Sequence, residues 1–287
     1  MVILYALLSY GISVPHIILP HFKAEQLYIK LDKKLLLHAK RIDVSFSNND
    51  QNKTPLLGIP RISPLIDFTR QIFQSFKVDE LNMDGYKVTF SYMDKPMSPQ
   101  DNSATLVSDD IKAKLLYRVY EEHIVIDLPH LKHTPSNITI SGRSLIDFKD
   151  DMTYGLFTLS LPDCANIQLV AKANGEAIAF NAYSNEFTDL APVIKLFELP
   201  HSISRWIVDN NDAISYQLVR AEGIYEYENP DTIVNTLFLH AHEKGLRYTF
   251  HEDIPAIASA STDVYFRQGV LNIKPHQASD NKHSVDD

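Results

Sequence analysis

The stretch YGLFTLSLPDCANIQLVAKANGEAIAFNAY, residues 154–183, decides the fold class. It contains three runs rich in apolar, β-branched and aromatic residues, at 154–161, 167–173 and 177–183, with short polar segments between them. Runs of this length and composition, bounded by turn residues, are typical of β-strands. Asn174-Gly175 is the kind of dipeptide that supplies the positive φ of a tight hairpin turn. The stretch therefore predicts an antiparallel meander.

The same pattern recurs on both sides of this stretch. Further strands are predicted at residues 25–32, 35–46, 87–92, 111–120, 123–128, 137–141, 213–227, 234–242, 246–250, 262–266 and 270–273. Turn signals such as Asp84-Gly85, Lys244-Gly245 and Gln268-Gly269 separate neighbouring runs. Several runs, such as 35–37, are apolar on both faces, which fits a sheet covered on both sides or a buried central strand. We predict a mainly β fold with a few α-helices.

Helices are expected at only two places in the predicted β-rich body, residues 21–275. Residues 62–76 carry apolar side chains at helical spacing, with Ser63 as the N-cap. A second helical region is predicted within 189–209, interrupted near Pro200. The polar tail, residues 276–287, is predicted to be disordered because it has little apolar surface to bury.

The N-terminal residues 1–20 are predicted to be a membrane anchor. Met1 to Leu19 contains no Asp, Glu, Lys or Arg, and a transmembrane helix needs about 20 predominantly apolar residues. Pro15 and His16 interrupt the run, so a buried apolar strand or helix is the alternative. The residues expected to contact lipid are Val2, Ile3, Leu4, Leu7, Leu8 and Ile12.

Composition excludes several classes of function. The 36 acidic residues against 27 Lys and Arg give a net charge of −9, and no basic cluster with aromatic residues marks a nucleic-acid interface. The single cysteine, Cys164, cannot form an intramolecular disulfide, and we expect it to be a small packing residue.

The sequence carries no motif for catalysis or for a cofactor. His240 and His242 share a strand face and His251 follows one predicted hairpin later, which keeps a metal-dependent hydrolase as an alternative. However, no His-Glu-x-x-His, Gly-x-Ser-x-Gly or Gly-rich phosphate loop is present. We therefore predict no enzyme, no catalytic residue, no metal and no cofactor; a structural or scaffold protein is the other alternative.

Three segments resemble a known family. The first is FKAEQLYIKLDKKLLLHAKRIDV (22–44), which follows the apolar N-terminus. The second is SISRWI (202–207), which precedes VRAEG (219–223), and the third is the closing module of residues 237–273. In order and residue type, these segments resemble AsmA-like proteins, and the C-terminal part is similar to the YhdP-type branch, whose members are typically longer.

The resemblance implies a single-pass inner-membrane protein with its body in the periplasm. That body would be a curved, groove-like β-sheet that binds phospholipid acyl chains. The implied role is phospholipid transport between the inner and outer membranes, with other envelope proteins as possible partners. On this view the groove is lined by Leu27, Ile29, Leu237, Leu239, Leu271 and Ile273.

Overall fold

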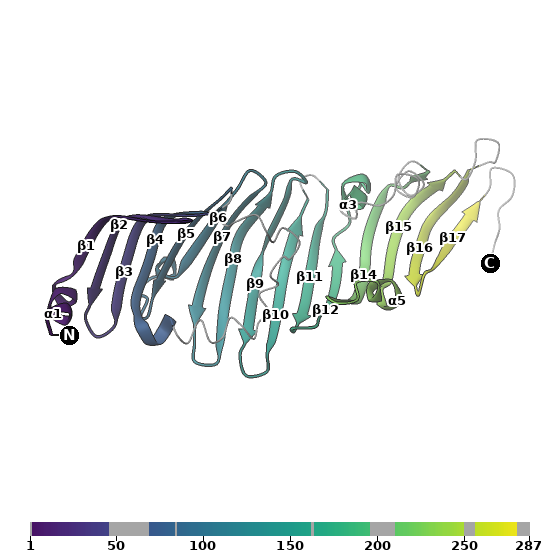
Figure 1. The fold of residues 1–287 in the computed structure, drawn as a ribbon. Helices are drawn as coiled ribbons and strands as arrows, with labels where there is room; N and C mark the ends of the chain where they lie inside the picture. The colour runs from purple at the N-terminus through teal and green to yellow at the C-terminus, as the bar shows by residue number, and fades with distance from the viewer. Residues whose placement is uncertain are drawn as a thin grey trace. The chain divides into compact units, whose positions relative to one another are not determined.

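The computed structural model describes residues 2–45, 69–83, 85–161, 164–195, 210–249 and 256–279. Within these residues the chain is mainly β, with 17 strands in a mostly antiparallel meander and a few short helices (Figure 1). The chain divides into two compact units. The first comprises Met1–Pro135 and Ser141–Thr153, and the second Ser136–Ile140 and Tyr154–Asp287.

The first unit is built from consecutive, hydrogen-bonded strands. In chain order its elements are α1 (Val2–Tyr10), β1 (Ile12–Leu19), β2 (Phe22–Leu31), β3 (Leu35–Val44), β4 (Phe73–Met83), β5 (Tyr86–Met93), η2 (Pro99–Asp101), β6 (Ser103–Val107), β7 (Ile111–Val119) and β8 (His123–His133). Each strand from β1 to β8 pairs antiparallel with the next, except that β3 and β4 are parallel. β9 (Ile138–Asp147) and β10 (Met152–Ser160) have residues in both units.

The second unit continues the meander with short helices at strand ends. Its further elements are β11 (Asn166–Ala173), β12 (Ala177–Ser184), α3 (Ala191–Lys195), β13 (Asn211–Asp212), β14 (Ser215–Glu226), α5 (Thr232–Thr236), β15 (Phe238–Tyr248), β16 (Ile257–Arg267) and β17 (Val270–Ser279). All pairings from β11 to β17 are antiparallel, and β12 pairs directly with β14. The predicted meander is thus confirmed.

Residues 1–20 do not form the single helix expected of a membrane anchor. α1 ends at Tyr10, Gly11 donates to the carbonyls of Leu7 and Leu8, and β1 then pairs with β2, with Ile12 opposite Ile29. The β-branched residues of β1 favour a strand. No helix among the described residues is long and apolar enough to span a bilayer. Of the six expected anchor residues, Val2, Ile3, Leu4, Leu7 and Leu8 lie on α1 and Ile12 lies on β1.

The predicted helix of residues 62–76 differs from the structure in its C-terminal part. Residues 69–72 are helical, but Phe73 begins β4, and Phe76 lies opposite Leu37 of β3. The aromatic residues fit helical spacing, but pairing with β3 places them in a strand. The second region contains α3, whereas residues 62–68 and 196–209 lie outside the described residues.

The C-terminal strands are longer than predicted. β15 runs through Gly245 to Tyr248, so Lys244-Gly245 is not a hairpin turn, and residues 232–236 form α5 where a strand was expected from 234. β17 reaches Ser279, so the disordered tail predicted from 276 was placed too early; residues 280–287 lie outside the described part. Gln268 and Gly269 do form a turn with positive φ, at 50° and 76°.

The register of β15, β16 and β17 separates their side chains into two faces. Leu239, Phe266 and Leu271 lie opposite one another, as do Ala241, Val264 and Ile273. Because side chains alternate along a strand, these six residues form one face, which we call the apolar face. The opposite face carries two rows, His240 with Tyr265 and Asn272, and His242 with Asp263 and Lys274. We call it the polar face.

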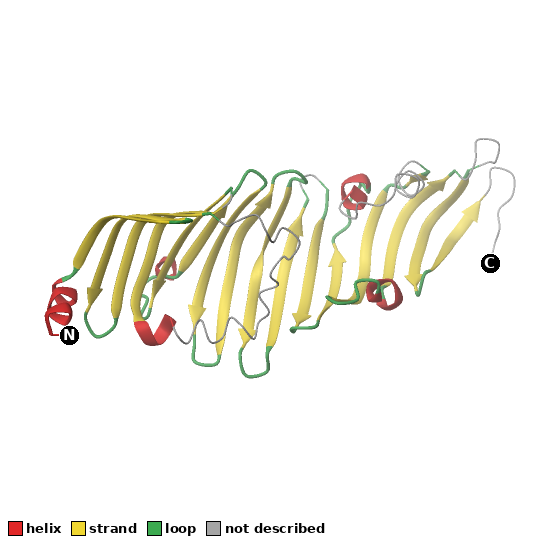
Figure 2. Ribbon diagram, viewed as in Figure 1, coloured by secondary structure: helices red, strands yellow, loops and turns green. Residues whose placement is uncertain are grey.

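The cores of the two units are small. In the first unit, the aromatic rings of Phe73, Phe76, Phe90 and Tyr117 follow one another across β4, β5 and β7, with centroids 5.4, 5.5 and 5.9 Å apart. In the second unit, a buried cluster of Leu161, Ala165, Phe187 and Tyr216 lies beside the partly buried Cys164. Cys164 is thus a packing residue, as expected. The described strands of each unit form a single layer (Figure 2).

Candidate functional site on the C-terminal strands

The apolar face of β15–β17 is only partly covered by the protein's own side chains. Leu271 and Ile273 are each 44% exposed although they project from the same face as Val264 and Phe266. Leu239 is half-buried on that face. Leu271 and Ile273 therefore extend the apolar row of Val264 and Phe266 into an exposed apolar surface, and exposed apolar patches in soluble proteins mark interaction sites.

The other predicted groove residues lie in different surroundings. Leu237 precedes β15, where its backbone N–H donates to the carbonyl of Ile233 and closes α5. Leu27 and Ile29 lie on β2 of the first unit, in register with Ala39 and Leu37 of β3. Ala39 is fully buried, so this part of the first unit is more closely packed than β17.

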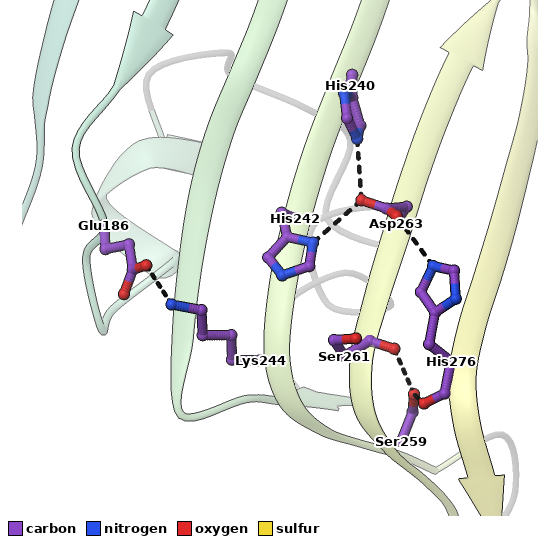
Figure 3. A network of polar contacts seen from close by, with 8 residues as sticks. All are labelled: Glu186, His240, His242, Lys244, Ser259, Ser261, Asp263 and His276. Atoms are coloured by element: carbon purple, nitrogen blue, oxygen red, sulfur yellow. Dashed lines mark hydrogen bonds and ion pairs between the residues drawn. The ribbon is translucent and has the colours of Figure 1, made fainter.

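The polar face is organised around the carboxylate of Asp263 on β16 (Figure 3). Its Oδ1 lies 2.9 Å from His240 Nε2 and 3.0 Å from His242 Nδ1, both on β15. Its Oδ2 lies 3.0 Å from His276 Nε2 on β17. Because an ionised carboxylate only accepts hydrogen bonds, all three imidazoles donate, which fixes their tautomers. One carboxylate therefore connects three strands.

Two aromatic contacts hold this face in place. The ring of His240 stacks on Tyr265 with centroids 4.4 Å apart and planes 13° from parallel. The ammonium of Lys274 lies 5.3 Å from the centroid of the same Tyr265 ring. Hydrogen bonds from His240 and His242 hold the pKa of Asp263 well below its usual range; desolvation opposes them with a smaller effect, and the hydrogen bond from His276 lowers the pKa by less again. Asp263 is thus ionised at neutral pH.

The cluster is not arranged to hold a metal ion. The Asp263 carboxylate occupies the position at which the imidazoles converge (Figure 3). Among the described residues, no group of three His, Cys, Asp or Glu side chains is placed to bind a metal. His240 and His242 share a face as predicted, whereas His251 lies outside the described residues.

We expect Asp263→Asn to lower the free energy of unfolding by about 1–2 kcal/mol at pH 7, because a neutral amide oxygen is a weaker acceptor for the two partly buried imidazoles than an ionised carboxylate. The exposed His276 should contribute little to this loss. Since the pKa of Asp263 is depressed by folding, its stabilisation is present above about pH 4 and is lost as the pH falls further. Urea unfolding at pH 7 and pH 3 measures both effects.

Asp231→Asn is the matched control, because Asp231 is exposed and makes no capping hydrogen bond to α5. It should leave the urea midpoint unchanged within error. An Asp263→Asn protein as stable as the wild type at pH 7 would contradict the structural role of the cluster.

A buried carboxyl group also lies on the apolar side of β15. Glu243 is 6% exposed, lies opposite Thr262 and accepts a 2.9 Å hydrogen bond from Asn211 Nδ2. Desolvation raises the pKa of Glu243, and the hydrogen bond from Asn211 opposes this only in part. Folding therefore favours the protonated form of this side chain.

For a carboxyl group with a raised pKa, stability is greatest below the unfolded pKa of about 4.3 and falls as the pH rises through the folded value. Glu243→Gln should therefore stabilise the chain at pH 7, by about 1 kcal/mol, because a neutral amide has no charge whose burial or protonation costs free energy. The difference in stability between this variant and the wild type should decrease as the pH is lowered toward 4. A thermal unfolding series from pH 4 to pH 8 tests this, and a variant that is less stable at pH 7 would contradict it.

The first unit has an open cavity of about 410 Å³ at its strand ends. Lys23, Asp43, Asn82 and Lys87 contribute its polar lining, and Phe22, Val44 and Met83 are among its apolar residues. Asp43 accepts hydrogen bonds from Arg41 Nε and Asn82 Nδ2, and the Asn82 bond is the main reason why its pKa is lowered. The lining thus contains two lysines and one carboxylate, Asp43.

Sequence reasoning found the two histidines on β15 but missed their partners. Asp263 lies on another strand, and His276 falls in the segment expected to be disordered. The alternation of Asp263, Tyr265 and Arg267 in a predicted strand is the one local signal that could have placed Asp263 on a polar face.

No family model, curated protein or solved structure matches the chain.

Proposed function

We propose that this chain is a non-enzymatic lipid-binding protein that holds acyl chains against the apolar face of its sheet. The observation that carries the proposal is the exposure of Leu271 and Ile273 on a face where the neighbouring strand β16 presents Val264 and Phe266 in register with them. Among the described residues of this unit, no second sheet packs on that face. The part of this face that stays exposed, on β17, is apolar in the way that one side of a hydrophobic core is.

An acyl chain is a suitable occupant because it is long, apolar and flexible. Each methylene removed from water contributes about 0.8 kcal/mol, so several methylenes along adjacent strands offset the cost of ordering the chain. The headgroup would stay in water at the sheet margin. This mechanism needs no titrating group, and we assign no catalytic residue.

The resemblance to AsmA-like proteins adds a biological setting to this proposal. In that setting the chain contributes to phospholipid transport between the inner and outer membranes. An envelope scaffold is the competing proposal, in which another protein covers the apolar face. The two proposals differ in what co-purifies with the chain and in whether the purified chain takes up free lipid.

The test uses the full chain, because β1 pairs with β2 and removal of residues 1–20 would expose a strand edge. Purified protein is extracted with organic solvent and its lipids are identified by mass spectrometry; delipidated protein is then titrated with fluorescently labelled phospholipid. We expect bound phospholipid and saturable uptake. Protein that is empty after purification and takes up no labelled lipid would overturn the proposal.

A further inference from the structure

The polar face of β15–β17 gathers three imidazoles among a small excess of cationic side chains. Around the three imidazoles, β14 contributes Arg220, which lies opposite His240, and Glu222. The cations on this surface are Arg220, Lys244, Arg267 and Lys274, and the carboxylates are Glu186, Glu222 and Asp263. The surface therefore has one more cation than carboxylates when the imidazoles are neutral.

Ion pairs neutralise the cations of β14 and β15 on this surface, so the excess positive charge lies on β16 and β17. Lys244 bonds to Glu186 (Figure 3), and Arg220 bonds to Glu222 on its own strand. Asp263 is engaged by the three imidazoles. Lys274 lies over Tyr265, and Arg267 is exposed at the end of β16.

Histidine is the ordinary side chain that changes charge between pH 5 and 8. A protonated imidazole donates from both ring nitrogens, so each of the three can keep its bond to Asp263 and direct its second N–H elsewhere. Protonation of all three would add three positive charges to the same face. Two side chains lie at the accessible margin of the polar face. The side chain of His276 is 54% exposed, and Val270, an apolar residue at the start of β17, is 56% exposed.

We propose that the polar face of β15–β17 is a docking surface for an anionic lipid bilayer, and that His240, His242 and His276 strengthen docking as the pH falls. The occupant is identified by charge complementarity and by the extended, single-layer surface that the three strands present. Because acyl chains are assigned to the opposite face, this proposal does not require the proposed lipid-binding function to be correct.

The expected increase in affinity for an anionic membrane follows from the positive charge that protonation adds. Each cationic side chain close to an anionic membrane surface contributes about 1 kcal/mol, so three protonated imidazoles correspond to roughly a 100-fold tighter association. The gain should decrease with salt, because exposed charges are screened within about 10 Å at 0.1 M ionic strength.

The test is co-sedimentation of the full chain with vesicles of phosphatidylcholine, with and without phosphatidylglycerol, at pH 5.5 and 7.5. Wild-type protein should bind the anionic vesicles roughly 100-fold more tightly at the lower pH, and should bind pure phosphatidylcholine weakly at both. The triple variant His240→Gln, His242→Gln, His276→Gln should lose the pH dependence, because each amide can still donate to Asp263 but cannot acquire charge.

The matched control is His123→Gln, His130→Gln, His133→Gln, which removes three histidines from β8 in the first unit. This control should keep the wild-type pH dependence. Circular dichroism at both pH values shows that each variant is folded. Equal pH dependence in both triple variants, equal binding to neutral vesicles, or competition by inorganic phosphate at millimolar concentration would each overturn the proposal.

Lys274→Glu provides a second readout that does not depend on histidine. It reverses a charge on the same face, so it should weaken binding to anionic vesicles at both pH values. Unchanged binding by this variant would place the docking surface elsewhere. Phospholipid uptake from solution should remain normal in all these variants if acyl chains use the opposite face, so failure of one proposal is distinguishable from failure of the other.

Discussion

Replacing Leu271 and Ile273 together by Glu should abolish uptake of labelled phospholipid while the chain stays folded. Both side chains are substantially exposed on the apolar face of β17, so charged replacements there reach solvent and cost little stability. A lipid tail, however, would have to lie against two carboxylates, and their desolvation costs several kcal/mol each. We expect binding to fall by at least about 100-fold, equivalent to about 3 kcal/mol.

Val270→Glu is the control for this experiment. Val270 lies on the same strand, is 56% exposed and projects from the polar face opposite Arg267. The Val270→Glu substitution introduces a negative charge into the same strand, and it should leave lipid uptake unchanged. If Val270→Glu and the double variant reduce uptake equally, the apolar face is not the binding surface.

Gly245→Val should lower the free energy of unfolding by about 2–4 kcal/mol, the largest stability change we expect from a single substitution. Gly245 has a φ of +61° within β15, which a β-branched residue adopts at a high cost. A Cβ at this position would lie 2.5 Å from Ile214 Cδ1 and 2.8 Å from its Cγ1. Urea unfolding followed by circular dichroism measures the loss.

Gly175→Val is the matched substitution, because a Cβ there meets nothing within 4 Å and the residue has no positive φ. It should change stability by less than about 0.5 kcal/mol, as expected for an unconstrained surface position. A Gly245→Val protein as stable as Gly175→Val would show that β15 tolerates a regular strand geometry at residue 245.

Strands that consist of an apolar run bounded by polar turn residues were predictable from the sequence. Residues 167–173 and 177–183 were placed within one residue of β11 and β12, because apolar runs and a polar turn are local properties. Gly175, by contrast, does not have the positive φ expected of it. The backbone path of a turn depends on both strands that it joins, and composition records only the residue type.

The errors arose where distant pairing decides the structure. Phe73 and Phe76 satisfy a helical pattern, and only the parallel pairing of β4 with β3 places them in a strand. Lys244-Gly245 has the composition of a turn, yet β15 continues because β16 pairs on both sides of Gly245. Such pairings join residues far apart in sequence, so a local pattern does not encode them.

The candidate site was predictable only in part for the same reason. Alternation placed His240 and His242 on one face, and Leu271 and Ile273 together on another face, which the register bears out. The Asp263 carboxylate comes from a neighbouring strand whose register was unknown, and His276 lies in a segment judged too polar to fold. The pairing of β17 with β16 supplies both.

Photocrosslinking can locate the acyl chain that we propose to lie against the apolar face of β17. A benzophenone amino acid is placed at position 271 or at position 270, and each protein is irradiated with bound phosphatidylcholine at pH 7.5 in the absence of vesicles, so that the polar face is not docked on a bilayer, and analysed by mass spectrometry. The proposed function predicts a phospholipid adduct from position 271 and almost none from position 270, on the opposite face. Equal adducts from both positions, or an adduct from position 270 alone, would contradict it.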